Sequence, residues 1–156
     1  MFREIFFILD VIGLGMLLGG GVYESVVINP NYRTNIPQAL ENLRSFMKSK
    51  TPANYFRIVS PVTMISLLIT LIICWGILSE RWWFMGAFLI LIAADTITYS
   101  FHYPRNKVLF IDPLSPDTKR LTRLAKQWQI GNKIRIGLLA TAILSVMLGI
   151  FALVQF

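Results

Sequence analysis

Polar and ionisable side chains recur at helical spacing inside the longest apolar stretches of this chain. The densest set places a carboxyl, a hydroxyl, a phenol and an imidazole on one helical face, at Asp95, Thr98, Tyr99 and His102. In a lipid bilayer such side chains are costly unless they face an enclosed interior, where they mark binding or proton-transfer sites. Because histidine titrates near neutral pH, His102 is either a hydrogen-bond donor at the membrane interface or a group for acid–base chemistry.

Two further segments carry side chains of complementary chemistry. Glu24 ends a glycine-rich apolar stretch, where it is either an interfacial acid in water or the partner of a buried base. Trp128, Asn132 and Arg135 present an aromatic ring, an amide and a guanidinium on one helical strip. We expect Arg135 to face the interior and pair with Glu24 or Asp95, either as a structural ion pair or as part of a binding site.

The remaining polar groups in apolar stretches have simpler interpretations. Asp10 lies about one turn inside the first stretch and is read as a solvated or Ser/Thr-bonded acid. Thr63, Ser66 and Thr70 share a face of the second stretch, which is typical of hydroxyls bonded one turn back or to a facing helix. The glycines of the first stretch indicate close packing of a neighbouring helix.

Composition places all these side chains in a membrane protein. The chain has 156 residues, of which 55% are hydrophobic and 15% charged, and its mean hydropathy of +0.62 excludes an ordinary soluble domain. A transmembrane helix needs about 20 apolar residues, and the stretches that qualify are residues 5–28, 58–79, 82–103 and 134–156. We therefore predict an all-α fold, a four-helix transmembrane bundle forming one domain over residues 1–156.

Both long loops are predicted to contain helix. The first has apolar residues at helical spacing between Ile36 and Met47, opposite charged ones, which predicts an amphipathic helix at the membrane interface. Thr51 followed by proline is a typical helix start, and so is the segment around Pro116, so the second and fourth helices are expected to begin before the membrane. Pro61 is expected to kink or restart the second helix.

Basic residues are distributed unequally between the two ends of the predicted bundle. The two long loops and their flanks hold 13 of the 15 Lys and Arg residues, which predicts cytoplasmic loops and both termini outside. We expect a multi-pass integral membrane protein, of the bacterial inner membrane, whose partners are the lipid bilayer and a hydrophobic small molecule. Nucleic-acid binding is not expected, because the net charge of +7 flanks membrane helices. A homo-oligomer is left open.

Metal binding is not predicted, and neither is another cofactor. The chain has one His and one Cys, too few for a multi-histidine or Cys/His site. The less favoured alternative is that Glu24, Asp95 and His102 converge on one iron or zinc ion.

Three motifs occur in order along the chain. A glycine-rich first stretch ends in Tyr23-Glu24, Pro104-Arg105-Asn106 follows the third stretch, and Trp128-x3-Asn132-x2-Arg135 opens the fourth. Together they resemble the anthrone oxygenase-like family of small four-helix membrane proteins. The resemblance implies a four-helix membrane bundle. For the characterised fungal members it also implies oxidation of a polyketide anthrone to an anthraquinone by molecular oxygen, with no known cofactor.

These observations and the resemblance predict a cofactor-independent oxygenase acting near the cytoplasmic face on a hydrophobic phenolic or polyketide-type aromatic substrate. His102 is the expected base and Glu24 a second proton acceptor, while Arg135 and Asn132 are expected to stabilise the substrate oxyanion. The expected substrate-binding residues are Tyr23, Asp95, Tyr99, Tyr103, Asn106 and Trp128. The alternatives are a non-catalytic quinone- or lipid-binding membrane protein, and an accessory subunit that docks through residues 36–47.

Overall fold

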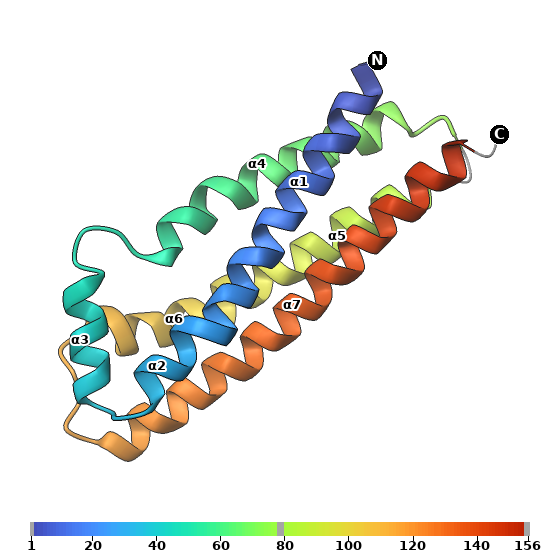
Figure 1. Cartoon of the computed structure of the whole chain (residues 1–156). Helices are drawn as coiled ribbons and strands as arrows, with labels where there is room; N and C mark the ends of the chain where they lie inside the picture. The colour runs from blue at the N-terminus through green and yellow to red at the C-terminus, as the bar shows by residue number, and fades with distance from the viewer. Residues whose placement is uncertain (1, 78–79, 155–156) are drawn as a thin grey trace.

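Four long apolar helices form a bundle in the computed structural model, which describes residues 2–77 and 80–154 (Figure 1). In chain order the elements are α1 (Phe2–Tyr23), a π-helical turn (Glu24–Ile28), α2 (Asn29–Arg33), α3 (Gln38–Phe46), α4 (Pro52–Ile73), α5 (Arg81–Ile97), a π-helical turn (Thr98–His102), α6 (Tyr103–Asn106), a π-helical turn (Lys107–Ile111) and α7 (Thr118–Val154). The described part of the chain contains no strand. The predicted all-α bundle is confirmed, and its four helices fit an integral membrane protein.

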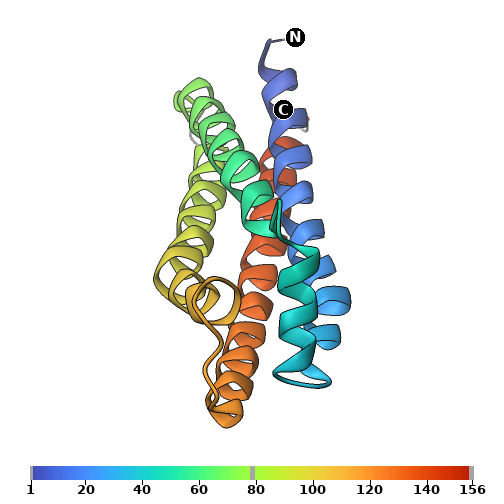
Figure 2. The same ribbon diagram turned by 90° about the vertical axis from the view of Figure 1, so that its left-hand side faces the viewer.

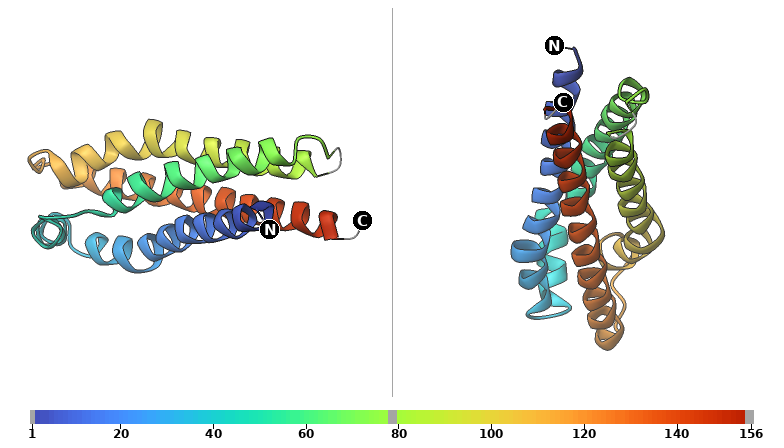
Figure 3. Two further views of the ribbon diagram at one scale, coloured as in Figure 1. Left: turned by 90° about the horizontal axis from the view of Figure 1, so that it is seen from above. Right: turned by 90° about the vertical axis from the view of Figure 1, so that its right-hand side faces the viewer.

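The long helices pack in a closed ring. α1 packs against α4 and α7, and α5 packs against the same two helices, so α1 and α5 lie diagonally opposite (Figure 3). Both termini lie at one end of the bundle, and α2, α3 and α6 lie at the other, which we call the α3 end (Figures 1 and 2). That the α3 end faces the cytoplasm stays a prediction from the basic residues.

At the α3 end the helices continue past the predicted apolar segments. The first helical run reaches Arg33, the third reaches Ile111, and α7 already begins at Thr118. Asp117 caps α7, because its Oδ1 accepts the backbone N–H of Arg120 at 3.0 Å. With 37 residues, α7 is about 55 Å long and exceeds the roughly 30 Å hydrocarbon layer. Part of the bundle therefore projects beyond the membrane.

The second span differs from its prediction at one end. α4 begins at Pro52 as expected, and the backbone N–H of Thr51 donates to Oδ1 of Asn54 at 2.9 Å. Pro61 lies inside α4 without ending it. The helix stops at Ile73, earlier than the predicted residue 79, because the chain turns at Cys74. Residues 78–79 and 155–156 of the predicted segments lie outside the described residues.

Two clusters of buried side chains divide the bundle along its length. The upper cluster fills the space between the long helices, where Phe7 of α1 stacks on Phe84 of α5 with ring centroids 5.3 Å apart. The lower cluster, at the α3 end, consists of Tyr32, Leu40, Leu109, Leu121, Ala125 and Trp128. Asp10 of α1 is also buried, and its carboxylate accepts hydrogen bonds from Ser66 and Thr70, each at 2.5 Å. The Ser/Thr-bonded interpretation of this acid is confirmed.

The predicted amphipathic helix exists as α3 and docks on the helix ends. Its apolar face buries Leu40 in the lower cluster. On the same side, the Arg44 guanidinium donates to the carbonyl oxygens of Val108, Leu109 and Asp112, at 2.6 to 3.0 Å. These carbonyls end the third helical run, so Arg44 caps it. A position of α3 at the membrane interface stays a prediction.

Arg44→Met should release α3 from the bundle without unfolding the long helices. Hydrogen bonds from a charged group contribute about 1.5 to 3 kcal/mol, so protection of the α3 amides against hydrogen exchange should fall at least tenfold. Lys48→Met, an exposed change close by with no bonded partner among the described residues, is the control. Unchanged α3 protection in Arg44→Met would show that the cap is not what holds the helix.

Candidate functional site

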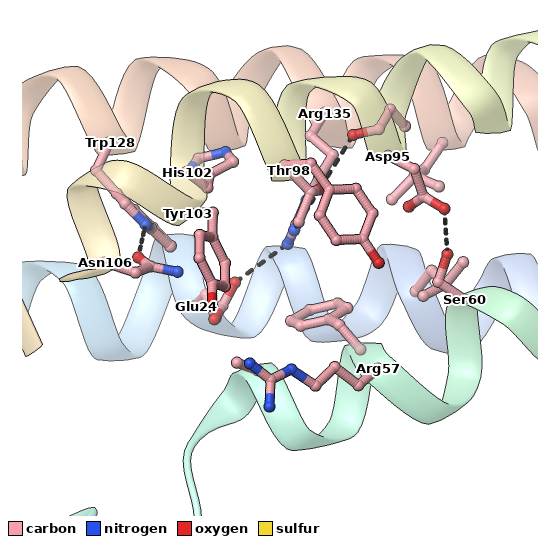
Figure 4. Close-up of a pocket in the computed structure, with 16 residues that line it drawn as sticks. Glu24, Arg57, Ser60, Asp95, Thr98, His102, Tyr103, Asn106, Trp128 and Arg135 are labelled. Carbon is pink, nitrogen blue, oxygen red and sulfur yellow. Dashed lines mark hydrogen bonds and ion pairs between the residues drawn. The ribbon is translucent and has the colours of Figure 1, made fainter. Parts of the chain in front are cut away.

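A cavity of about 90 Å³ lies between the two clusters and receives side chains from all four long helical runs (Figure 4). Eight of the ten predicted site residues line it: Glu24, Asp95, Tyr99, His102, Tyr103, Asn106, Trp128 and Arg135. Tyr23 and Asn132 do not line it. α4 adds four residues that the sequence interpretation did not include, namely Ala53, Phe56, Arg57 and Ser60. We call this space the central cavity.

A buried ion pair forms one wall of the central cavity. Nη2 of Arg135 lies 3.2 Å from Oε2 of Glu24, so of the two expected partners Arg135 takes Glu24. The guanidinium also lies 4.4 Å from the ring centroid of Phe56, and its Nη1 lies 3.4 Å from the Thr98 hydroxyl. The second carboxylate oxygen of Glu24 has no hydrogen bond to a described residue. One strong acceptor is therefore left open at the cavity.

The second acid of the site belongs to a different wall. Oδ2 of Asp95 accepts a hydrogen bond from the Ser60 hydroxyl at 2.6 Å, which joins α5 to α4. Asp95 forms no ion pair with Arg135. In Figure 4 this bond lies at the opposite side of the cavity from the Trp128–Asn106 contact. The cavity therefore has two acids that are separately held.

His102 is enclosed in the cavity wall. Only 2% of its surface is exposed, and its ring packs edge-on against Trp128 with centroids 4.9 Å apart. Neither ring nitrogen makes a hydrogen bond of regular geometry with a described residue, although the Gly131 backbone lies beside the ring. Buried polar groups are nearly always bonded, so an imidazole left this way is unusual.

The motif residues of α7 connect it to its neighbours. Nε1 of Trp128 donates to Oδ1 of Asn106 at 2.6 Å, which joins α7 to α6. Nδ2 of Asn132 donates to the carbonyl oxygen of Gly21 at 2.9 Å and so joins α7 to α1. Tyr23 lies on the outer surface, with 57% of its area exposed. Asn132 is thus placed for helix packing, and Tyr23 faces away from the cavity.

Two of the π-helical turns contain the two candidate proton-transfer residues of the site. Glu24 begins one turn and His102 ends another. A π-helical turn inserts an extra residue and rotates the side chains that follow, and such turns are frequent at functional sites. The four-residue face predicted around Asp95 is changed accordingly, because Tyr99 is 69% exposed while His102 is enclosed. No spacing rule in the sequence indicated these turns.

A second cavity of about 260 Å³ adjoins the first toward α3. The two cavities share Glu24, Ala53, Arg57, Tyr103, Asn106 and Trp128. Beyond this shared wall, the second cavity is lined mainly by apolar residues, among them Ile28, Leu43, Met47, Phe110 and Ile111. Glu24 therefore stands at the junction of two hollows whose combined size suits a small organic molecule.

Metal ligands do not gather in this region. Within residues 2–77 and 80–154, no three His, Cys, Asp or Glu side chains lie close enough together to hold one ion.

No protein-family model, no curated protein and no solved structure matches this chain. The resemblance to the anthrone oxygenase-like family therefore rests on the three ordered motifs.

The Glu24–Arg135 pair should behave as a coupled unit in stability. Glu24→Gln or Arg135→Met alone leaves one buried charge without its partner, which typically costs about 3 to 5 kcal/mol. The double variant removes both charges, so its thermal unfolding midpoint in lipid nanodiscs should lie above that of either single variant. If the midpoint of the double variant falls by the sum of the two single decreases, the two charges contribute independently.

Gly131→Ala should disturb the His102 wall. A Cβ at Gly131 would lie 2.6 Å from the Phe101 ring and 3.2 Å from Cε1 of His102, so the Phe101 ring must move. Gly137→Ala on the same helix meets no side chain within 4 Å and is the matched control. We expect Gly131→Ala to lower the unfolding midpoint and Gly137→Ala to leave it unchanged or raise it, by up to about 1 kcal/mol of helix propensity. Equal midpoints in both variants would contradict this packing.

Proposed function

We propose that this chain binds a flat, membrane-soluble phenolic molecule in the central cavity and the second cavity that adjoins it, and oxidises the molecule with molecular oxygen. The observation that carries the proposal is the Glu24 carboxylate, which is held by Arg135 through one oxygen while the other remains unbonded at the junction of two cavities. A positioned carboxylate with a free oxygen is suited to removing a proton from a bound molecule. The resemblance to the anthrone oxygenase-like family points to the same chemistry.

The cavity walls suit an aromatic ligand with a polar oxygen. Phe56, Tyr103 and Trp128 provide ring surfaces for stacking. The Asn106 amide uses its oxygen for Trp128, which leaves its N–H groups available, and Arg57 reaches the same space from α4 (Figure 4). Donors next to ring surfaces favour a phenol or a ketone over a plain hydrocarbon.

The proposed reaction converts an activated methylene group into a ketone. Glu24 takes a proton from the methylene carbon, and the charge moves onto the conjugated ligand oxygen, where the Arg135 guanidinium at the cavity wall stabilises it. The carbanion then forms a C–O bond with O2, and the peroxide takes up a proton. Loss of the second C–H proton with cleavage of the O–O bond gives the ketone and water. Overall, CH2 and O2 become C=O and H2O, and the four electrons of the carbon reduce O2.

His102 is the second candidate for proton transfer. Its ring lines the central cavity, which supports the role predicted from the sequence. Both of its nitrogens are enclosed by neighbouring side chains, however, whereas Glu24 lines both cavities. The geometry therefore favours Glu24 as the base in direct contact with the ligand.

Oxygen uptake with anthrone as substrate tests this proposal. In nanodiscs, Glu24→Gln should lower the rate at least about a hundredfold, the usual contribution of a general base, while anthrone binding measured by tryptophan fluorescence changes little. Glu24→Asp keeps the negative charge but places the carboxylate farther from the ligand, because the side chain is one methylene shorter. This variant should remain folded and should also have a lower oxygen-uptake rate. The control is Asp10→Asn, which changes the other buried acid of the first helical run; Asp10 lines neither cavity, so this variant should keep full activity.

The outcomes separate the alternatives. If wild-type protein binds anthrone but consumes no oxygen above the protein-free rate, oxygenation is wrong and a quinone- or lipid-binding role replaces it. If His102→Gln loses the rate and Glu24→Gln retains it, the base is His102. If anthrone neither binds nor reacts, the proposal falls entirely.

A further inference from the structure

An apolar groove runs along the outer face of the bundle between α4 and α5. Its volume is about 530 Å³, and it is lined by Ser60, Pro61, Met64, Ile65, Ile92, Asp95, Thr96, Tyr99 and Ser100. Ile65 is 58% exposed there, on a helix face that is directed to lipid when α4 spans the membrane. We call it the α4–α5 groove.

The α4–α5 groove adjoins the central cavity. Ser60, Asp95 and Tyr99 line both spaces, so the interior and the lipid side meet at these three side chains. The Ser60–Asp95 bond of 2.6 Å is the one side-chain hydrogen bond between α4 and α5 among the described residues. A molecule held in the central cavity could therefore extend outward past these three residues with little to displace.

Both helices are irregular beside the groove. Pro61 has no N–H, so α4 lacks the backbone bond that would reach the carbonyl of Arg57. On the other side, the π-helical turn Thr98–His102 follows directly on α5. Figure 2 shows α4 and α5 close together near the turn that connects them and apart toward the α3 end. The groove lies where two weakened helix segments diverge.

We propose that the α4–α5 groove binds the hydrocarbon substituent of the ligand. The ligand class is then an amphiphile, a phenol or quinone ring with an alkyl or prenyl chain, whose ring occupies the central cavity and whose chain passes Tyr99 into the groove and the lipid. The mainly apolar surface of the groove, its lipid-facing side and the three residues it shares with the cavity select this occupant over a polar one. The inference rests on the proposed function only in placing the ring in the central cavity.

The test compares two probes with one phenol head, orcinol, whose substituent is a methyl group, and its undecyl homologue. Ile65→Trp fills the groove, and Ile72→Trp, on the same exposed face of α4 but outside every cavity described, is the matched control. In nanodiscs of one lipid composition, Ile65→Trp should weaken the undecyl probe at least about tenfold and orcinol less than about twofold. Ile72→Trp should change neither affinity. Since all proteins meet the same lipid, partitioning of the probe cancels.

Each result has a defined meaning. If Ile65→Trp leaves undecyl binding unchanged, or weakens both probes equally, the groove does not bind the chain. If orcinol binds, and the undecyl probe binds no more tightly once its higher concentration in the lipid is taken into account, the phenol site is supported and the groove inference is wrong. If orcinol fails to bind while undecyl binding is lost in Ile65→Trp alone, the groove is confirmed and the phenol site is wrong.

Discussion

The buried ion pair between Glu24 and Arg135 is the constraint on which the rest of the structure depends. A single unpaired charge among apolar helices would strongly destabilise the fold, so the two side chains must lie at the same depth in the bundle. Their contact fixes α1 against α7 at the level where the two buried clusters adjoin. Asn132, one turn before Arg135, reinforces the same register through the Gly21 carbonyl. α7 is thus the long helix against which both α1 and α5 pack.

The central cavity follows from this arrangement. Closed packing is interrupted where π-helical turns carry Glu24 and His102, and where α4 diverges from α5. The polar groups that meet there use only part of their hydrogen-bonding capacity, unlike Asp10, which is fully engaged by two hydroxyls. The contrast between these two regions of one bundle indicates that the hydrogen bonds of Asp10 stabilise the helices, while the polar groups of the central cavity are suited to bind a molecule.

Hydropathy was sufficient to predict the four helices, because crossing a bilayer demands a long apolar run that few other structures require. Typical helix-capping residues predicted where α4 and α7 begin. The need to pair a buried charge left two candidate partners for Arg135, Glu24 and Asp95. The π-helical turns could not be predicted, because they depend on packing between helices rather than on local sequence. Tyr99, which the spacing placed on the inward face, is mostly exposed in the structure. Asn132 lies on the same helical strip as Arg135, so the sequence placed it in the site. Its side-chain amide instead donates to the Gly21 carbonyl oxygen, a contact that the spacing could not indicate.

The most direct test of the central claim is the carbon NMR signal of the side-chain carboxyl groups in nanodiscs as a phenolic ligand is added. The account predicts that titrating orcinol or anthrone shifts the Glu24 carboxyl resonance in a saturable manner. The Asp10 resonance, from an acid of the same helix that lies outside the cavities, should stay in place. A Glu24 signal that does not move, or that moves only together with Asp10, would contradict a ligand site built on the Glu24–Arg135 pair.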